Sequence, residues 1–172
     1  MKEYPVLSND EMARAIRNGR KTQTRCPVKG VPEGATEVRA EVSNGKLIAT
    51  YRAFSDGGSA RWGIGESPFG GPGDRLWVRE CWAYVNDYDG HRVLDGHTVL
   101  YRSDGDIEPN RWRPSSNMPR WACRTILEVV DVWVERVQDI DPADAIDEGG
   151  SRDTRPNNNP WIWVAAFRRV TE

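Results

Sequence analysis

Apolar positions with helical spacing appear first near the N-terminus, where they predict a short helix over 8–17. Three apolar residues share one side of this repeat: Met12, Ala13 and Ile16. Ser8 followed by Glu11 matches a capping box at the helix start, and Asn18-Gly19 matches a helix end. The polar residues that follow are therefore expected to leave the helix from a fixed point.

Runs of β-branched and aromatic residues predict about six strands along the rest of the chain. The strands cover 37–42, 46–54, 75–83, 98–102, 123–137 and 161–170. Ser43-Asn44-Gly45 joins the first two strands as a hairpin turn. The run over 123–137 is apolar on both faces, which is typical of a strand at the centre of a sheet.

Two long stretches without a period are expected to be loops, and one more helix follows the longest strand. The stretch over 54–73 is rich in glycine, and the stretch over 104–120 is irregular. Asp141 caps a predicted helix over 141–148, which ends before Gly149.

The order of these elements indicates the fold class. Strands come in runs with helices at the corners, which favours a mainly β, α+β domain over a parallel sheet. We expect a small β-barrel with two short helices and long inserted loops. The length of 172 residues fits a single domain over 1–172.

Basic residues are unevenly divided between arginine and lysine. The net charge is −2, so the surface as a whole is not suited to hold nucleic acid. Of the 24 basic residues only four are lysine: Lys2, Lys21, Lys29 and Lys46. Arginine offers a planar fork for phosphates and base edges, and the eight tryptophans offer stacking faces. The same composition also fits a tryptophan-rich core, so both interpretations stay open.

Cysteine and histidine are too few and too dispersed for a disulfide framework or a metal site. The three cysteines lack a Cys-x-x-Cys spacing, and only two histidines occur. We therefore expect buried free thiols, no metal and no cofactor. No apolar run reaches about 18 residues, and the first residues lack the apolar segment of a signal peptide. These features predict a protein of the cytoplasm that does not enter a membrane.

The residues directly after the first helix form the first candidate site. The run over 19–25 reads GRKTQTR and places two hydroxyls among three cations. A hydroxyl needs a neighbouring base to become a nucleophile, and Lys21 can serve Thr24 if burial favours a neutral amine. The alternative is a solvated basic turn that ends the helix. Taken alone, the motif favours this alternative.

Acidic residues near the end of the helix over 141–148 form the second candidate site. Asp144 and Glu148 are four residues apart and share a face, with Asp147 beside them. Carboxylates near a helix C-terminus oppose its dipole, which suggests a partner cation or a functional role. A solubilising surface is the alternative.

Arginines and tryptophans alternate in the third candidate site, over 111–124. Four arginines lie here without an acidic neighbour: Arg111, Arg113, Arg120 and Arg124. Trp112 and Trp121 lie between them. Cations alternating with rings suit a surface that follows a nucleic-acid backbone and stacks bases. A loop folded over the barrel, with buried tryptophans, fits equally well.

Five blocks in this order resemble the ASCH-domain proteins, in particular those encoded by phages and prophages. The blocks are GRKTQTR after the helix, PGDRLWVRE, WRPSSNMPRWACR, DVWVERVQDI followed by AIDEG, and the aromatic C-terminal strand. The match covers nearly the whole chain. The resemblance implies a PUA-like β-barrel with a cleft beside the basic motif, located in the host cytoplasm if the protein is phage-encoded.

The resemblance also implies a chemistry. A small bacterial member is an amidohydrolase that removes the acyl group from N4-acetylcytidine with a lysine, a threonine three residues later and a distant glutamate. Those positions correspond to Lys21, Thr24 and Glu148. Where that enzyme has an arginine two residues after the threonine, this chain has Cys26, and Arg25 lies one residue earlier.

The expected function is binding of a nucleoside or RNA base, with hydrolysis of the amide of an N4-acylated cytidine. Thr24 would be the nucleophile and Lys21 its base, while Glu148 would orient Lys21 or shuttle a proton. Six more residues are expected to bind sugar-phosphate or stack on the base: Arg20, Arg25, Arg111, Trp112, Arg113 and Arg120. A non-catalytic reader of modified nucleic acid and a ribonuclease are the alternatives.

Overall fold

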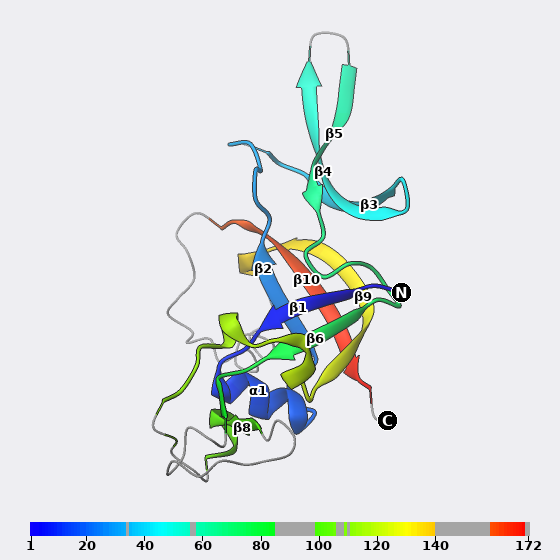
Figure 1. Cartoon of the computed structure of the whole chain (residues 1–172). Coiled ribbons are helices and arrows are strands. Elements are labelled where there is room, and N and C mark those ends of the chain that lie inside the picture. The colour runs from blue at the N-terminus through cyan, green and yellow to red at the C-terminus, as the bar shows by residue number, and fades with distance from the viewer. Residues whose placement is uncertain are drawn as a thin grey trace.

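The fold is mainly β, as predicted. The computed structural model of the chain describes residues 1–33, 35–55, 58–84, 99–105, 109, 111–139 and 159–170. These residues form ten strands, one α-helix and several short 3-10 turns (Figure 1). The predicted helix over 141–148 lies outside the described residues. No helix among those described has the length and apolar character needed to cross a membrane.

A five-stranded sheet forms the body of the molecule. Its strands run in the order β1 (Glu3–Leu7), β6 (Arg75–Arg79), β9 (Ile126–Arg136), β10 (Trp161–Arg169) and β2 (Gln23–Pro27). β1 and β6 are parallel, and the other neighbours are antiparallel. β1 and β2 form the two edges, and within the described residues no pairing joins them into a closed barrel.

A second, three-stranded sheet contains β3 (Val38–Ser43), β4 (Lys46–Ser55) and β5 (Gly58–Glu66). The predicted hairpin is confirmed, because Ser43 pairs with Lys46 around Asn44 and Gly45 at φ 50° and 70°. These positive angles are those of the tight turns that join twisted strands. β4 and β5 project away from the five-stranded sheet (Figure 1).

The prediction of a continuous loop over 54–73 was wrong, because β5 occupies much of it and pairs with β4. Its glycines conceal an alternating pattern in which Trp62 and Ile64 flank Gly63. Glycine lowers intrinsic strand preference, but the neighbouring strand β4 supplies the hydrogen bonds that fix β5.

The helix α1 (Asp10–Arg17) starts one residue later than the capping box predicts. Asn9 is the N-cap, and its side chain accepts a hydrogen bond from Met12 N at 2.8 Å. Ser8 is buried instead, and its backbone N–H donates to Arg79 O at 2.9 Å. The predicted end is confirmed, with Gly19 at φ 71°.

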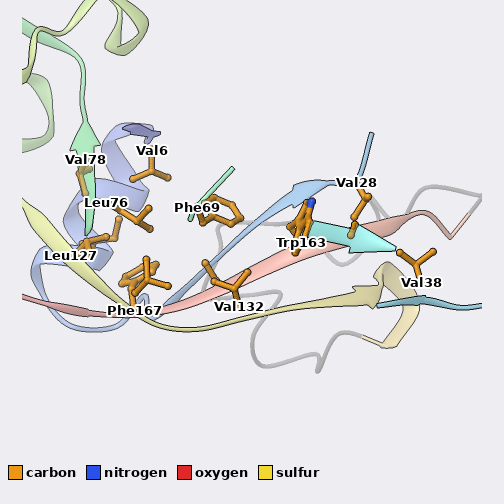
Figure 2. Close-up of a cluster of buried hydrophobic side chains, with 14 residues drawn as sticks. Val6, Val28, Val38, Phe69, Leu76, Val78, Leu127, Val132, Trp163 and Phe167 are labelled. Atoms are coloured by element: carbon orange, nitrogen blue, oxygen red, sulfur yellow. The ribbon is translucent and has the colours of Figure 1, made fainter. Parts of the chain in front are cut away.

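The main core lies against the inner face of the five-stranded sheet and continues to the base of the hairpin sheet. Figure 2 shows Leu76 and Leu127 at one end and Val38 at the other. Trp163 and Phe167 of β10 belong to the same cluster. β10 therefore has a core-facing row of odd-numbered residues, which fixes the orientation of its neighbour β2.

A second, smaller core lies under residues 111–124, the arginine- and tryptophan-containing segment. β7 (Trp82–Tyr84) pairs with β8 (Val99–Tyr101), and Trp82 packs with Met118 and Ala122. The predicted strand over 75–83 is therefore two strands, interrupted at Glu80 and Cys81. Four 3-10 turns complete the described structure: η2 (Arg102–Asp104), η3 (Ser115–Asn117), η4 (Arg120–Ala122) and η5 (Val137–Asp139).

Candidate functional site

Lys21 lies in the interior between α1 and β2, with 4% of its surface exposed. The helix end determines this position, because the backbone N–H groups of Arg20 and Lys21 both donate to Ala15 O, at 2.9 and 3.2 Å. Lysine is rarely buried, since removing an ammonium group from water is costly unless other groups compensate. The solvated basic turn considered from the sequence therefore does not describe Lys21.

Thr24 lies in strand β2 and is half-buried. The segment that follows α1 does not continue as a helical turn, because strand β2 begins at Gln23. Thr24 pairs with Ala165, which belongs to the core-facing row of β10. The Thr24 side chain therefore lies on the inner face of the sheet, next to the small side chain of Ala165.

A β-bulge lies close to this position. The register between β9 and β10 shifts after Ala166, so that Phe167 pairs with Val129. The extra residue is Val130 of β9, and on the neighbouring strand β10 Phe167 N donates to Thr22 O at 2.9 Å, between Lys21 and Thr24. Bulges are common beside active sites, where they redirect a side chain or interrupt pairing.

Arg25 faces the opposite side of β2. Its Nε lies 3.3 Å from Glu135 Oε1, and its Nη2 donates to Gln23 Oε1 at 2.8 Å. Trp133 Nε1 donates to the other oxygen of Glu135 at 2.8 Å. Only 7% of the Arg25 side chain is exposed, so this guanidinium is held within the protein. Its predicted role in binding phosphate remains a prediction.

The three cysteine thiols are weak nucleophiles at neutral pH. Burial raises the pKa of the Cys26, Cys81 and Cys123 thiols above the usual value. The thiolate is the reactive form, so these thiols are largely unreactive. Among the described residues, no three His, Cys, Asp or Glu side chains gather in a way that suits a metal ion.

The arginine- and tryptophan-containing segment is largely committed to internal contacts. Arg113 lies over the Tyr84 ring at 4.8 Å, and Arg120 donates to both oxygens of Glu3 at 2.7 and 3.0 Å. Trp112 is half-buried, whereas Arg111 is exposed, as is Arg20 at the end of α1. The alternative of a loop folded over the rest of the domain therefore fits Arg113 and Arg120. Arg20 and Arg111 are exposed to solvent instead.

A buried ion network beside this segment was missed from the sequence. Glu80 is fully buried and accepts hydrogen bonds from Arg17, Arg124 and Ser103 at 2.5 to 3.1 Å. Asp104 pairs with the same two arginines. One signal could have revealed it: Glu80 occupies the apolar row of the pattern over 75–83, where a charge needs a partner.

Glu148, with Asp144 and Asp147, lies outside the described residues. The structure therefore brings Lys21 and Thr24 to the same helix–strand junction, while the approach of Glu148 to that junction stays a prediction. Comparisons of this chain with protein-family models, with curated proteins and with solved structures find no match.

Proposed function

We propose that the chain is a PUA-like domain of the ASCH kind that binds a nucleobase or nucleoside beside Lys21 and Thr24. Its proposed reaction is hydrolysis of the amide of an N4-acylated cytidine. The burial of Lys21, two residues before the start of β2, is the observation that carries this proposal. A structural lysine is normally left in water, whereas a catalytic amine benefits from an interior position.

The reaction requires a hydroxyl, a base and an amide carbonyl. Thr24 Oγ1 attacks the carbonyl carbon, and the Lys21 amine accepts the hydroxyl proton. That proton passes to the departing cytidine amine, and water then hydrolyses the acyl-threonine ester to release the acid. The neutral amine is the form that accepts a proton, so the reaction requires the bound site to favour that form of Lys21. Glu148 would orient Lys21 or relay a proton.

A non-catalytic reader is the second candidate. The exposed Arg20 and Arg111 favour it, because a reader needs cations for phosphate contacts and no nucleophile. It would hold a modified base at Lys21 without turnover.

Turnover of N4-acetylcytidine separates these candidates. Chromatography should detect cytidine with the wild-type chain, and Thr24→Val should lower the rate about a hundredfold or more. Valine keeps the shape and strand preference of threonine, so the fold should persist, which circular dichroism can verify. Thr22→Val is the matched control, since Thr22 is exposed two residues away on the same segment.

Equal rates for the two variants would show that Thr24 is not the nucleophile. Binding of the nucleoside without turnover by the wild-type chain would reject the hydrolase and support the reader.

A further inference from the structure

Strand β5 (Gly58–Glu66) leaves one edge of the three-stranded sheet unpaired. It pairs with β4 along one side, and no strand in the described part of the chain pairs with its other side. Figure 1 shows β4 and β5 extending away from the five-stranded sheet. Much of β5 is exposed, including Ser59, Ala60, Trp62 and Gly63. An edge strand offers unpaired N–H and C=O groups with which another strand can pair.

Few of the features that usually protect an edge strand occur in β5. It contains neither lysine nor proline. Its pairing with β4 shifts at Ile64, which leaves 58–63 as a regular strand. Arg61 is the one charged residue in that part, and it is already paired with Glu37 at 2.9 Å and with Glu41 at 3.3 Å. A second strand can therefore approach 58–63 without meeting an unpaired charge.

The pairing within the sheet determines which residues of β5 point outward. In antiparallel strands the backbone groups of successive residues point alternately to the two sides. Arg52 N in β4 donates to Glu37 O, next to β3, at 3.2 Å, so the odd-numbered Tyr51 points to β5. Tyr51 pairs with Trp62. The N–H and C=O groups of Trp62 therefore point to β4, and those of the residues on either side of Trp62 point outward.

A row of apolar side chains crosses the sheet and ends at this edge. Val38 of β3 pairs with Tyr51, which pairs with Trp62, and residues directly opposite each other share a face of the sheet. Val38 is buried in the main core and Tyr51 packs against that core. Trp62 is 58% exposed. The row thus leads from the core to an exposed ring at the unpaired edge.

We propose that β5 pairs with β5 of a second copy of the chain, antiparallel and with Trp62 opposite the partner's Trp62. The outward backbone groups of Arg61 then exchange hydrogen bonds with those of the partner's Gly63, and the two-fold axis repeats this exchange. Gly63 has no side chain to obstruct the approach of the second backbone. The apolar row continues across the axis from Tyr51 and Trp62 to the partner's Trp62 and the partner's Tyr51.

This register is favoured over the other symmetric registers. A two-fold axis at Arg61 would place like charges opposite each other, which is destabilising. An axis at Ala60 would leave Trp62 opposite the partner's Gly58, without a ring to contact. An axis at Trp62 makes a non-hydrogen-bonded pair, in which side chains are closest and aromatic rings stabilise the pairing. A second copy supplies the matching ring at the matching position. The inference does not depend on the proposed function.

Sedimentation velocity over a concentration series tests dimerisation. The mass of the wild-type chain should approach twice that of one chain as the concentration rises. Trp62→Lys should weaken dimerisation at least about tenfold, because it removes the ring pair and places two ammonium groups opposite each other. Val42→Lys is the matched control. Val42 is exposed in β3 of the same sheet, away from the β5 edge, and this variant should dimerise like the wild-type chain.

Disulfide cross-linking tests the register and does not depend on how Trp62→Lys folds. Opposed residues of a non-hydrogen-bonded pair have Cα atoms about 4.5 Å apart, which suits a disulfide. Trp62→Cys should therefore cross-link with oxidised glutathione, as seen on a non-reducing gel. Ala60→Cys is the matched control, since Ala60 is exposed on the same strand. In this register the two copies of residue 60 are four positions apart, about 14 Å along the strand.

The outcomes are distinct. Dimerisation that Trp62→Lys weakens and Val42→Lys does not, with cross-linking by Trp62→Cys at least about tenfold faster than by Ala60→Cys, supports the inference. The inference is overturned if the wild-type chain stays monomeric up to about 1 mM, the range of the weakest contacts. It is also overturned if the two lysine variants dimerise alike, or if the two cysteine variants cross-link at similar rates.

Discussion

Individual charged residues differ widely in how much they contribute to the stability of the fold, and burial decides the difference. Glu80 is enclosed and receives hydrogen bonds from Arg17, Arg124 and Ser103. Glu128 pairs with Arg168 in an arrangement of similar geometry, but 69% of that arginine side chain is exposed. Removing charges from water makes a buried pair sensitive to the loss of either partner, whereas solvent screens an exposed pair.

Replacement of Glu80 measures this difference. Glu80→Gln should lower the free energy of unfolding by about 3 kcal/mol, since it leaves Arg17 and Arg124 without their buried counter-charge. The matched change Glu128→Gln should cost less than about 1 kcal/mol. Urea denaturation followed by tryptophan fluorescence gives both values. Similar losses for the two variants would contradict a structural role for the buried network.

Among the elements, those with local determinants could be predicted from the sequence. The β3–β4 hairpin depends on Asn44-Gly45, whose turn chemistry is readable without knowledge of the rest of the fold. β9 and β10 are long and rich in β-branched and aromatic residues, which makes their strand character clear.

The two edge strands of the main sheet could not be predicted in the same way. β1 pairs with β6 some seventy residues later, and β2 pairs with β10 near the C-terminus. The sequence of β2, QTRCP, carries no apolar alternation of its own. The motif identified Lys21 and Thr24 as candidates, but the burial of Lys21 and the face of Thr24 depend on those distant pairings.

The turn that leads into β6 contains a close approach that only glycine allows. Gly70 has φ +71°, and an added Cβ would lie against the Tyr4 ring and 2.5 Å from Asp74 Oδ2. Gly70→Ala should lower the free energy of unfolding by about 3 kcal/mol, because backbone strain and steric overlap add. Urea denaturation measures the loss.

Gly19→Ala is the control for this prediction. Gly19 has the same φ of +71°, and an added Cβ would meet nothing within 4 Å. Gly19→Ala should therefore lower the free energy of unfolding by about 1 kcal/mol, from backbone strain alone. Equal losses at Gly70 and Gly19 would mean that the contact with Tyr4 and Asp74 is relieved at little cost.

At the scale of the whole molecule, the proposed site at Lys21 follows the C-terminal end of α1. The three-stranded sheet projects from the other side of the body, where β4 and β5 extend beyond the core (Figure 1). The proposed site thus lies between one short helix and the strand that follows it.

The central claim is that Lys21 contributes to binding a nucleobase, and isothermal titration calorimetry with N4-acetylcytidine tests it most directly. Lys21→Met keeps an unbranched side chain of similar length in the interior, so the fold should tolerate it. Loss of the hydrogen bond between Lys21 and the base should weaken binding about tenfold. Lys29→Met, at an exposed lysine eight residues later, should bind like the wild-type chain. Wild-type affinity in a folded Lys21→Met variant would contradict the claim.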